Sequence, residues 1–446
     1  MRVSVNYLIL SLYFFVYITP QYITDFFLAF DRVYPQMFLI SLINIIAFTY
    51  IIKSFNFKEF VTNFKHKKHF LSFLFVVIIS IISLLVADNF AEGLVSLVKL
   101  INLFLAYCFI LIIAFNSRFN LYNYFIVVTV ISLLIESVII NFQVIESVII
   151  NGNLLVRSNN FAGFGANINI SSFSVLIKTI VPIFLLFNYN HRLIRFTSCF
   201  LIISSFLTVM LLMSRAAIIS LLLVIIFIIL LSVLANKKKY YFATGLLFLS
   251  LLISTFSYNL INEKNAYNII GERFSNVTNP SADGSVNERL NFYTTSVKSI
   301  IDKPILGIGL GNWKIKSIDL SKDIIKGYRV PYFVHNDFLQ TAAEIGILGG
   351  LCFVFYILYP FWISFKKTIK HLRFNLDFMI FLIFLVYTVD SMLNFPFDRP
   401  INVIYLFFTI ILFYRSEKYY LKWKKYWFLW LVYCCLSHFP WGLIKN

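Results

Sequence analysis

Long apolar runs alternate with short polar connections along most of the chain. Runs of about 20 residues are long enough for a helix to cross roughly 30 Å of hydrocarbon. The pattern predicts about twelve spans, centred near residues 17, 44, 78, 104, 132, 178, 205, 226, 249, 355, 385 and 408. We therefore expect an all-α, polytopic membrane protein of about twelve transmembrane helices. The first run, from about Tyr7, has no small-residue cleavage site after it, so we expect a retained helix.

One long polar stretch, residues 258–336, interrupts this pattern. Loops of that length without structure of their own are rare, so we expect short amphipathic helices there, and 289–301 has apolar positions at helical spacing. The expected organisation is nine helices in 1–257, a large extracytoplasmic loop in 258–336, three helices in 337–416, and a basic tail in 417–446. That tail could lie in the cytoplasm, lie at the membrane interface or span the membrane.

Positive charge dominates the connections between the apolar runs. The chain is 60% hydrophobic and only 13% charged, yet its net charge is +18. A soluble protein with that charge would suggest a nucleic-acid partner, but basic residues of membrane proteins collect in cytoplasmic loops. With twelve spans the basic loops all fall on one side: Lys53–Lys68, Arg118, Arg192–Arg195, Lys237–Lys239, Lys366–Arg373 and Arg415–Lys425. We therefore expect membrane lipids and no nucleic acid as partners, and both termini in the cytoplasm.

Several ionisable residues lie inside apolar runs, where each costs about 2.5–3.5 kcal/mol on insertion scales and so needs a reason. Lys99 and Lys178 could snorkel to the interface or pair with a buried acid. Asp390 ends the eleventh run and could form an ion pair with Arg399. Arg215 interrupts LLMSRAAII at a tight turn, where Ser or Asn would serve at lower cost, so we expect a functional role for it.

The segment PYFVHNDFLQTAAEIGILGG, residues 331–350, places polar groups directly before an apolar helix. Asn336 and Asp337 suffice to cap that helix, so His335 is free for another role. By the predicted topology, His335 lies with Arg215 and Asp390 on the extracytoplasmic side. A base beside arginines suits proton abstraction from a hydroxyl, with a phosphorylated leaving group held by guanidinium groups.

Metal and cofactor chemistry find no support in the sequence. The five cysteines all lie in apolar runs, and a lone histidine lacks the partners that catalytic zinc needs. The chain contains no HExxH, GxSxG or Walker motif, and the large loop contains no DxD pair. We expect no metal and no cofactor.

Three motifs in order carry a resemblance to a known family: SRAA at 214–217, NERLNFYTTSVKSIIDKPILGIGLGNW at 287–313, and HNDFLQTAAEIGILGG at 335–350. The chain resembles the O-antigen ligase family and the related O-antigen polymerases. Upstream, VRSNNFAGFGANINISSF at 156–173 loosely resembles the family's Arg…Gly…Asn segment, with Arg157 and Asn167, but lacks its usual Pro-Asn.

The resemblance implies an inverting glycosyl transfer on the periplasmic side of the bacterial inner membrane. The donor would be a glycan on undecaprenyl diphosphate, and the acceptor a sugar hydroxyl of lipid A–core or of a second lipid-linked glycan. His335 would be the general base, and Arg215 and Arg289 would hold the diphosphate. Supporting roles would fall to Asp390, Asn336, Glu344 and Arg157.

Alternatives remain within and outside this family. The sequence does not distinguish a ligase from a polymerase, and a related protein-glycosylating ligase also stays open. A transporter or flippase of lipid-linked sugars would explain twelve spans with Lys99 and Lys178, but the asymmetric loop and the lack of visible inverted repeats count against it. We also expect Gly346, Gly349 and Gly350 to let a neighbouring helix approach closely.

Overall fold

The computed structural model describes residues 2–16, 18, 33–52, 68–115, 120–151, 163–165, 167–262, 284–321 and 331–415. Within these ranges the regular structure is helical, with no strands. Arg118, Arg157, the basic loop before Lys68 and the tail 417–446 lie outside them.

Ten helices in the described ranges are long and apolar enough to cross a membrane. They are α3 (Val33–Ile52), α5 (Lys68–Ser83) with its continuation η2 (Leu84–Val86), α6 (Phe90–Phe115), α7 (Leu121–Asn151), α8 (Ile168–Asn188), α9 (Arg192–Leu212), α10 (Arg215–Ala235), α11 (Lys238–Asn262), α15 (Asp337–His371) and α16 (Leu376–Leu393). Two shorter apolar helices, α1 (Arg2–Phe14) and α17 (Pro400–Arg415), match the first and last predicted spans. The structure confirms an all-α polytopic membrane protein, although α1 ends before residue 17, the predicted centre of its span.

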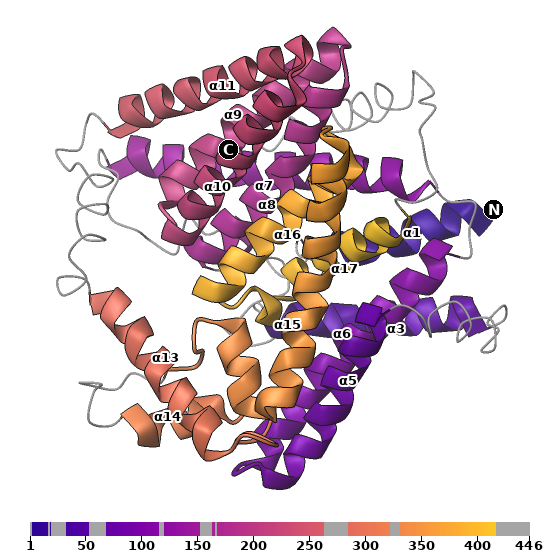
Figure 1. The fold of residues 1–446 in the computed structure, drawn as a ribbon, viewed down its shortest axis with the longest axis vertical. Coiled ribbons are helices and arrows are strands. Elements are labelled where there is room, and N and C mark those ends of the chain that lie inside the picture. The colour runs from indigo at the N-terminus through magenta and orange to yellow at the C-terminus, as the bar shows by residue number, and fades with distance from the viewer. Residues whose placement is uncertain are drawn as a thin grey trace.

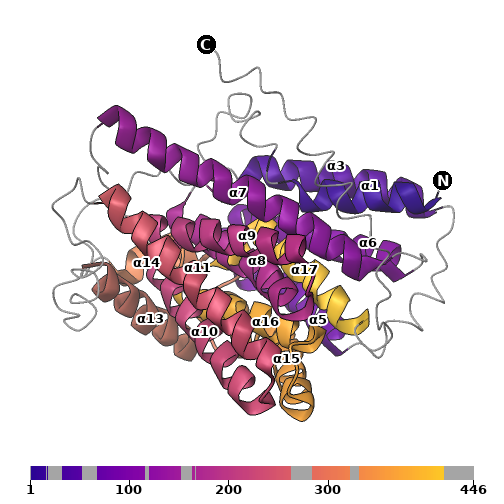
Figure 2. The same ribbon diagram turned by 90° about the horizontal axis from the view of Figure 1, so that it is seen from above.

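Helix α8 lies at the centre of the bundle, where it contacts α7, α9 and α16 (Figures 1 and 2). Every residue in the most apolar stretch of α8 is buried, whereas α10 and α11 keep broad apolar faces exposed. A helix that is apolar all round belongs in a core, and one with an exposed apolar face belongs against lipid. The arrangement is therefore a bundle with a buried central helix and a lipid-facing exterior.

Lys178 of α8 has the buried acidic partner that was one of its two predicted explanations. Its Nζ lies 2.8 Å from Oε2 of Glu136 in α7, and both side chains are almost fully buried. The Ser174 hydroxyl lies 3.1 Å from each Glu136 carboxylate oxygen and 3.1 Å from Lys178 Nζ. Glu136 is interior because α7 continues through both copies of IESVIIN. The pair explains the charge of Lys178 within an apolar helix.

The basic helix ends gather at one end of the bundle. Phe374, between α15 and α16, stacks on Phe187 of α8 with ring centroids 3.8 Å apart and contacts Tyr240 of α11 edge-on. The Arg195 guanidinium of α9 lies 5.1 Å from the Phe242 ring of α11. Three of the predicted basic loops thus lie side by side, which fits their assignment to a common side.

The polar stretch after α11 contains two described helices, α13 (Gly284–Asp302) and α14 (Trp313–Ser321), beside the start of α15 (Figure 1). Helix α13 confirms the amphipathic helix expected at 289–301. A small separate core joins these elements through Phe292, Ile308, Trp313, Val334 and Ala343. It fixes the segment before α15 against α13.

The turn at 303–312 inserts into a kink of α15, where Ile345 and Gly346 leave helical geometry. Ile347 N–H donates to Pro304 C=O at 2.9 Å, and Gly309 N–H donates to Glu344 C=O at 2.9 Å. The backbone groups freed by the kink are therefore satisfied by the turn.

Gly346 sits at the point of closest approach between this turn and α15. It has φ +80°, and a side-chain carbon there would overlap the Ile305 carbonyl oxygen. The expectation of a closely packed neighbouring helix was wrong at Gly346, because the close neighbour there is the turn. An added carbon at Gly349 would meet Ile345 at the kink, and one at Gly350 would meet Ala342 of the helical segment before the kink.

Candidate functional site

His335 lies in the segment 331–336 that leads into α15. Its φ of +61° is left-handed, an uncommon conformation for a residue with a side chain. Asn336 is the N-cap, because its Oδ1 accepts the Phe338 and Leu339 N–H groups at 3.0 Å each. As the sequence indicated, Asn336 performs the capping and leaves the imidazole of His335 for another role.

The His335 ring lies between two aromatic rings at one side of a cavity. Phe292 of α13 is nearly parallel to it at 6.4 Å between centroids, and Phe395 lies edge-on at 5.1 Å. Its Nδ1 is buried and has no hydrogen-bond partner among the described residues. Burial, and secondly the charge of Arg289, lower the pKa of His335 to about 4. The imidazole is therefore neutral at pH 7 and able to accept a proton.

Arg289 of α13 connects two other residues expected at the site. Its charge acts on His335 and also on Asp390 at the end of α16. The Asp390 carboxylate is buried, with Oδ1 accepting the Asn394 amide at 2.5 Å. Three elements far apart in the sequence thus bring His335, Arg289 and Asp390 together. The guanidinium of Arg399, the suggested partner of Asp390, lies 5.1 Å from the Phe395 ring.

Tyr293, one helical turn after Arg289, was not expected at the site. Its hydroxyl lies 3.1 Å from the carbonyl oxygen of His335 and 2.9 Å from that of Met392. Burial raises the pKa of Tyr293 and the nearby Arg289 charge partly offsets this, so the hydroxyl stays a donor at neutral pH. Its four-residue spacing from Arg289 on an amphipathic helix was the available signal.

Asp337 is the first residue of α15, but the Asn336 side chain, and not that of Asp337, caps the helix. Its buried carboxylate accepts Phe397 N–H at 3.0 Å through Oδ2. This bond joins the start of α15 to the short helix η6 (Pro396–Asp398), which follows α16 in the chain. Asp337 therefore links the helix that begins after His335 to the segment that follows Asp390.

Glu344 of α15 binds the turn at 303–312. Its Oε2 accepts Gly311 N–H at 2.9 Å, and Trp313 N–H is a second donor to the carboxylate. Because the turn connects α13 to α14, this carboxylate helps to fix the helix that carries Arg289. Its contacts are those of a structural residue.

The structure does not bring Arg215 to the cavity, whose lining residues do not include it. Arg215 is the first residue of α10, after the left-handed Met213 at the end of α9 and Ser214 at the N-cap position. Asn167, from the loosely matching upstream segment, is the N-cap of α8 and lines the cavity. Arg157 of the same segment lies outside the described residues.

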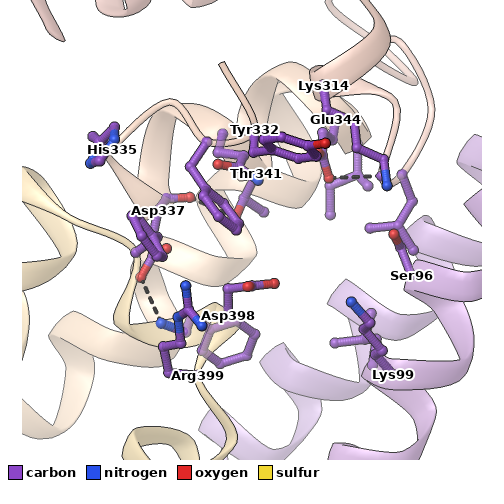
Figure 3. A pocket seen from close by; sticks show the side chains of 18 of the residues that line it. Ser96, Lys99, Lys314, Tyr332, His335, Asp337, Thr341, Glu344, Asp398 and Arg399 are labelled. Atoms are coloured by element: carbon purple, nitrogen blue, oxygen red, sulfur yellow. Dashed lines mark hydrogen bonds between the residues drawn. The ribbon is translucent and has the colours of Figure 1, made fainter. Parts of the chain in front are cut away.

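The cavity beside His335 has a volume of about 910 Å³, which is near the upper end for small-molecule sites. Its walls come from α3, α5, α6, α13, α14, α15, the segment before α15 and η6. Figure 3 shows His335 and Asp337 on one side, Ser96 and Lys99 on the opposite side, and Asp398 and Arg399 between them. Among the described residues, no three His, Cys, Asp or Glu side chains are grouped to hold a metal ion.

Comparison with curated proteins finds no match to the chain. A family model described as O-antigen ligase matches residues 200–354. That segment contains Arg215, Arg289 and His335, together with α13, α14, the inserted turn and the kink of α15. Over residues 200–354 the chain is similar to the O-antigen ligase family, which confirms the resemblance carried by its three motifs.

Proposed function

We propose that the protein is a glycosyltransferase of the bacterial inner membrane, acting on its periplasmic side. It moves a glycan from undecaprenyl diphosphate to a sugar hydroxyl, with lipid A–core as the acceptor of a ligase. The observation that carries this proposal is the grouping of His335, Arg289 and Asp390 beside a large cavity, within a segment similar to O-antigen ligases.

The proposed reaction is one direct displacement. The acceptor hydroxyl oxygen attacks the anomeric carbon of the donor sugar, and the bond from that carbon to the diphosphate oxygen breaks. The electron pair of the broken bond leaves with the diphosphate, and the hydroxyl proton passes to the imidazole of His335. Attack from the side opposite the leaving group inverts the anomeric configuration.

Arginines take the role of holding the leaving group. Guanidinium forks match phosphate oxygens in geometry and stabilise charge as it develops on the diphosphate. The charge of Arg289 acts on His335, which supports an arrangement with the diphosphate next to the reacting carbon. Asp390 is a positioning residue for Arg289, and Arg215 is the second arginine that the family resemblance implies. This accounts for diphosphate departure without a metal ion.

Donor binding also makes His335 a better base. In the free protein the Arg289 charge contributes to the low pKa of His335. A diphosphate bound to Arg289 brings negative charge that offsets this effect and raises the imidazole pKa toward its ordinary range. The base therefore gains strength when the donor is in place, which limits proton transfer in the donor-free state.

A reconstituted assay tests the proposal. Purified protein receives a lipid-diphosphate glycan with either lipid A–core or a second lipid-linked glycan as acceptor. A ligase joins the glycan to lipid A–core, whereas a polymerase lengthens the lipid-linked glycan. Transfer should depend on His335 and persist in excess chelator. Movement of the donor across vesicles without any new glycosidic bond would instead identify a transporter.

A further inference from the structure

Lys99 is a charge that the proposed reaction does not use. It lies in α6, well inside an apolar helix, outside the segment similar to O-antigen ligases. Its ammonium lies 4.4 Å from the centroid of the Tyr34 ring and forms no ion pair within the described part of the chain. Lys178, the other lysine inside a span, has Glu136 as partner. A cation at such a position costs insertion free energy, so it calls for a functional reason.

The Lys99 side chain points into the cavity that His335 lines (Figure 3). Other hydrogen-bond donors reach the same cavity from separate elements: Ser80 of α5, Ser96 of α6, Lys314 of α14, and Arg399 after η6. The Ser80 hydroxyl is buried and has no hydrogen-bond partner among the described residues. A phosphate, with three terminal oxygens, can accept from several such donors at once, and a lysine binds it as a point charge.

Four carboxylates line the cavity, Glu288, Asp337, Glu344 and Asp398, and each interacts with a partner within the protein. Glu344 is occupied by backbone N–H groups of the inserted turn, and Asp337 by Phe397 N–H. Asp398 faces the cavity, but the guanidinium of Arg399 faces it as well (Figure 3). Lys314 is paired with Glu92, with Nζ and Oε2 2.5 Å apart, which leaves Lys99 as the main uncommitted cation of the described wall.

The position of the cavity assigns it to the acceptor. A general base contacts the acceptor hydroxyl, and the cavity extends from His335 toward Lys99. Arg215 and Arg289, which hold the donor diphosphate in the proposed function, do not line it. We propose that the Lys99 side of this cavity binds a phosphate group of the acceptor glycan. This inference rests on the proposed function, because that function defines which substrate lies beside His335.

Direct binding measurements with full-length protein in nanodiscs test the subsite without turnover. The probes are lipid A–core carrying its phosphates, the same glycolipid after phosphatase treatment, and an undecaprenyl-diphosphate glycan. Lys99→Met should weaken binding of the phosphorylated acceptor by about ten- to a hundredfold, the usual range for one charge-assisted hydrogen bond. Lys99→Arg should keep most of the affinity. Lys298→Met changes an exposed lysine of α13 outside the cavity and serves as the matched control.

The comparison of probes decides the assignment. Binding of the dephosphorylated acceptor and of the donor should be the same in wild type and Lys99→Met, and unchanged donor binding also shows that the variant is folded. Equal loss for both acceptor forms, or loss confined to the donor, would overturn the phosphate subsite. Failure of the proposed function looks different: His335→Ala would then transfer glycan at the normal rate, whatever Lys99 does to binding.

Discussion

The Tyr293 hydroxyl lies 3.1 Å from the carbonyl oxygen of His335, so helix α13 is tied to the segment that carries the proposed base. The same hydroxyl lies 2.9 Å from the Met392 carbonyl at the end of α16. One side chain thus reaches both of the elements that carry His335 and Asp390. We therefore assign Tyr293 as a positioning residue. It contacts the backbone carbonyl of His335 and so fixes the residue that carries the imidazole.

Tyr293→Phe should lower kcat by about tenfold with little change in KM, because a misplaced base costs rate rather than substrate affinity. The protein should still fold, since the ring and its packing remain. Tyr241→Phe removes an exposed hydrogen bond to Asn236 at the basic end of the bundle and is the matched control. Steady-state transfer kinetics decide the matter, and an equal effect of both substitutions would remove the positioning role.

His335→Ala should reduce transfer by about 10²–10⁴-fold, the usual contribution of general-base catalysis. Donor binding should persist, because the diphosphate is assigned to arginines. The pH dependence carries more information than the loss itself. The neutral imidazole is the active form, so kcat/KM of the wild type should rise with pH through about 4, the lowered pKa of His335. The rise of kcat with pH should occur at a higher pH than the rise of kcat/KM, because bound diphosphate offsets the Arg289 charge and raises the pKa of His335.

Arg289→Gln supplies the matching test of that electrostatic coupling. Removing the positive charge should raise the His335 pKa and move the kcat/KM limb upward toward 6.5, even though the overall rate falls. Dividing each kcat/KM–pH profile by its plateau value separates the shift in the His335 pKa from the fall in overall rate. A limb that keeps its position in the variant would mean that Arg289 does not act on the catalytic base.

Arg215→Lys and Arg289→Lys keep the charge but lose the two-pronged hydrogen bonding of guanidinium. Each should weaken donor binding or slow leaving-group departure by at least about tenfold, because a fork and a point charge are not equivalent on a diphosphate. Binding of the lipid-diphosphate glycan and single-turnover rates separate the two effects. Lys298→Arg, on the exposed face of α13, is the control. Unimpaired transfer in Arg215→Lys would remove Arg215 from the donor site.

Much of the fold could be read from the sequence, because a membrane span requires a long apolar run and the runs here are well separated. His335 and Arg289 could be proposed from motif order, and Asn336 from its capping position. The kink at Gly346 could not be predicted, because the apolar run continues through it and the kink is held by a distant turn, at Pro304–Gly309.

Three-dimensional contacts explain the other differences. The role of Tyr293 depends on two carbonyl groups from distant segments, and nothing in its own neighbourhood identifies them. The acid that neutralises Lys178 lies in a different helix, so the sequence predicted a partner without naming Glu136. Spans follow from local composition, whereas pairings between helices follow from how the bundle packs.

The inserted turn makes Gly346→Ala a sharp test of the kink in α15. The added carbon would overlap the Ile305 carbonyl oxygen and would also require an alanine at φ +80°. A residue forced into such a conformation costs of order 1–3 kcal/mol, so we expect a clear fall in the thermal midpoint in detergent, together with loss of transfer. Displacement of the turn would also disturb the Glu344 carboxylate that holds Gly311.

Gly245→Ala is the matched control for this substitution, because Gly245 lies in α11 with φ outside the left-handed range and nothing within 4 Å of an added carbon. Alanine is the better helix former by about 1 kcal/mol, so this variant should be as stable as the wild type or more so. Both proteins are compared by thermal unfolding in the same detergent and by transfer rate. If Gly346→Ala melts with the wild type and transfers normally, the 303–312 turn does not hold α15 in its kinked form, and the link from Glu344 through the turn to the Arg289 helix is lost with it.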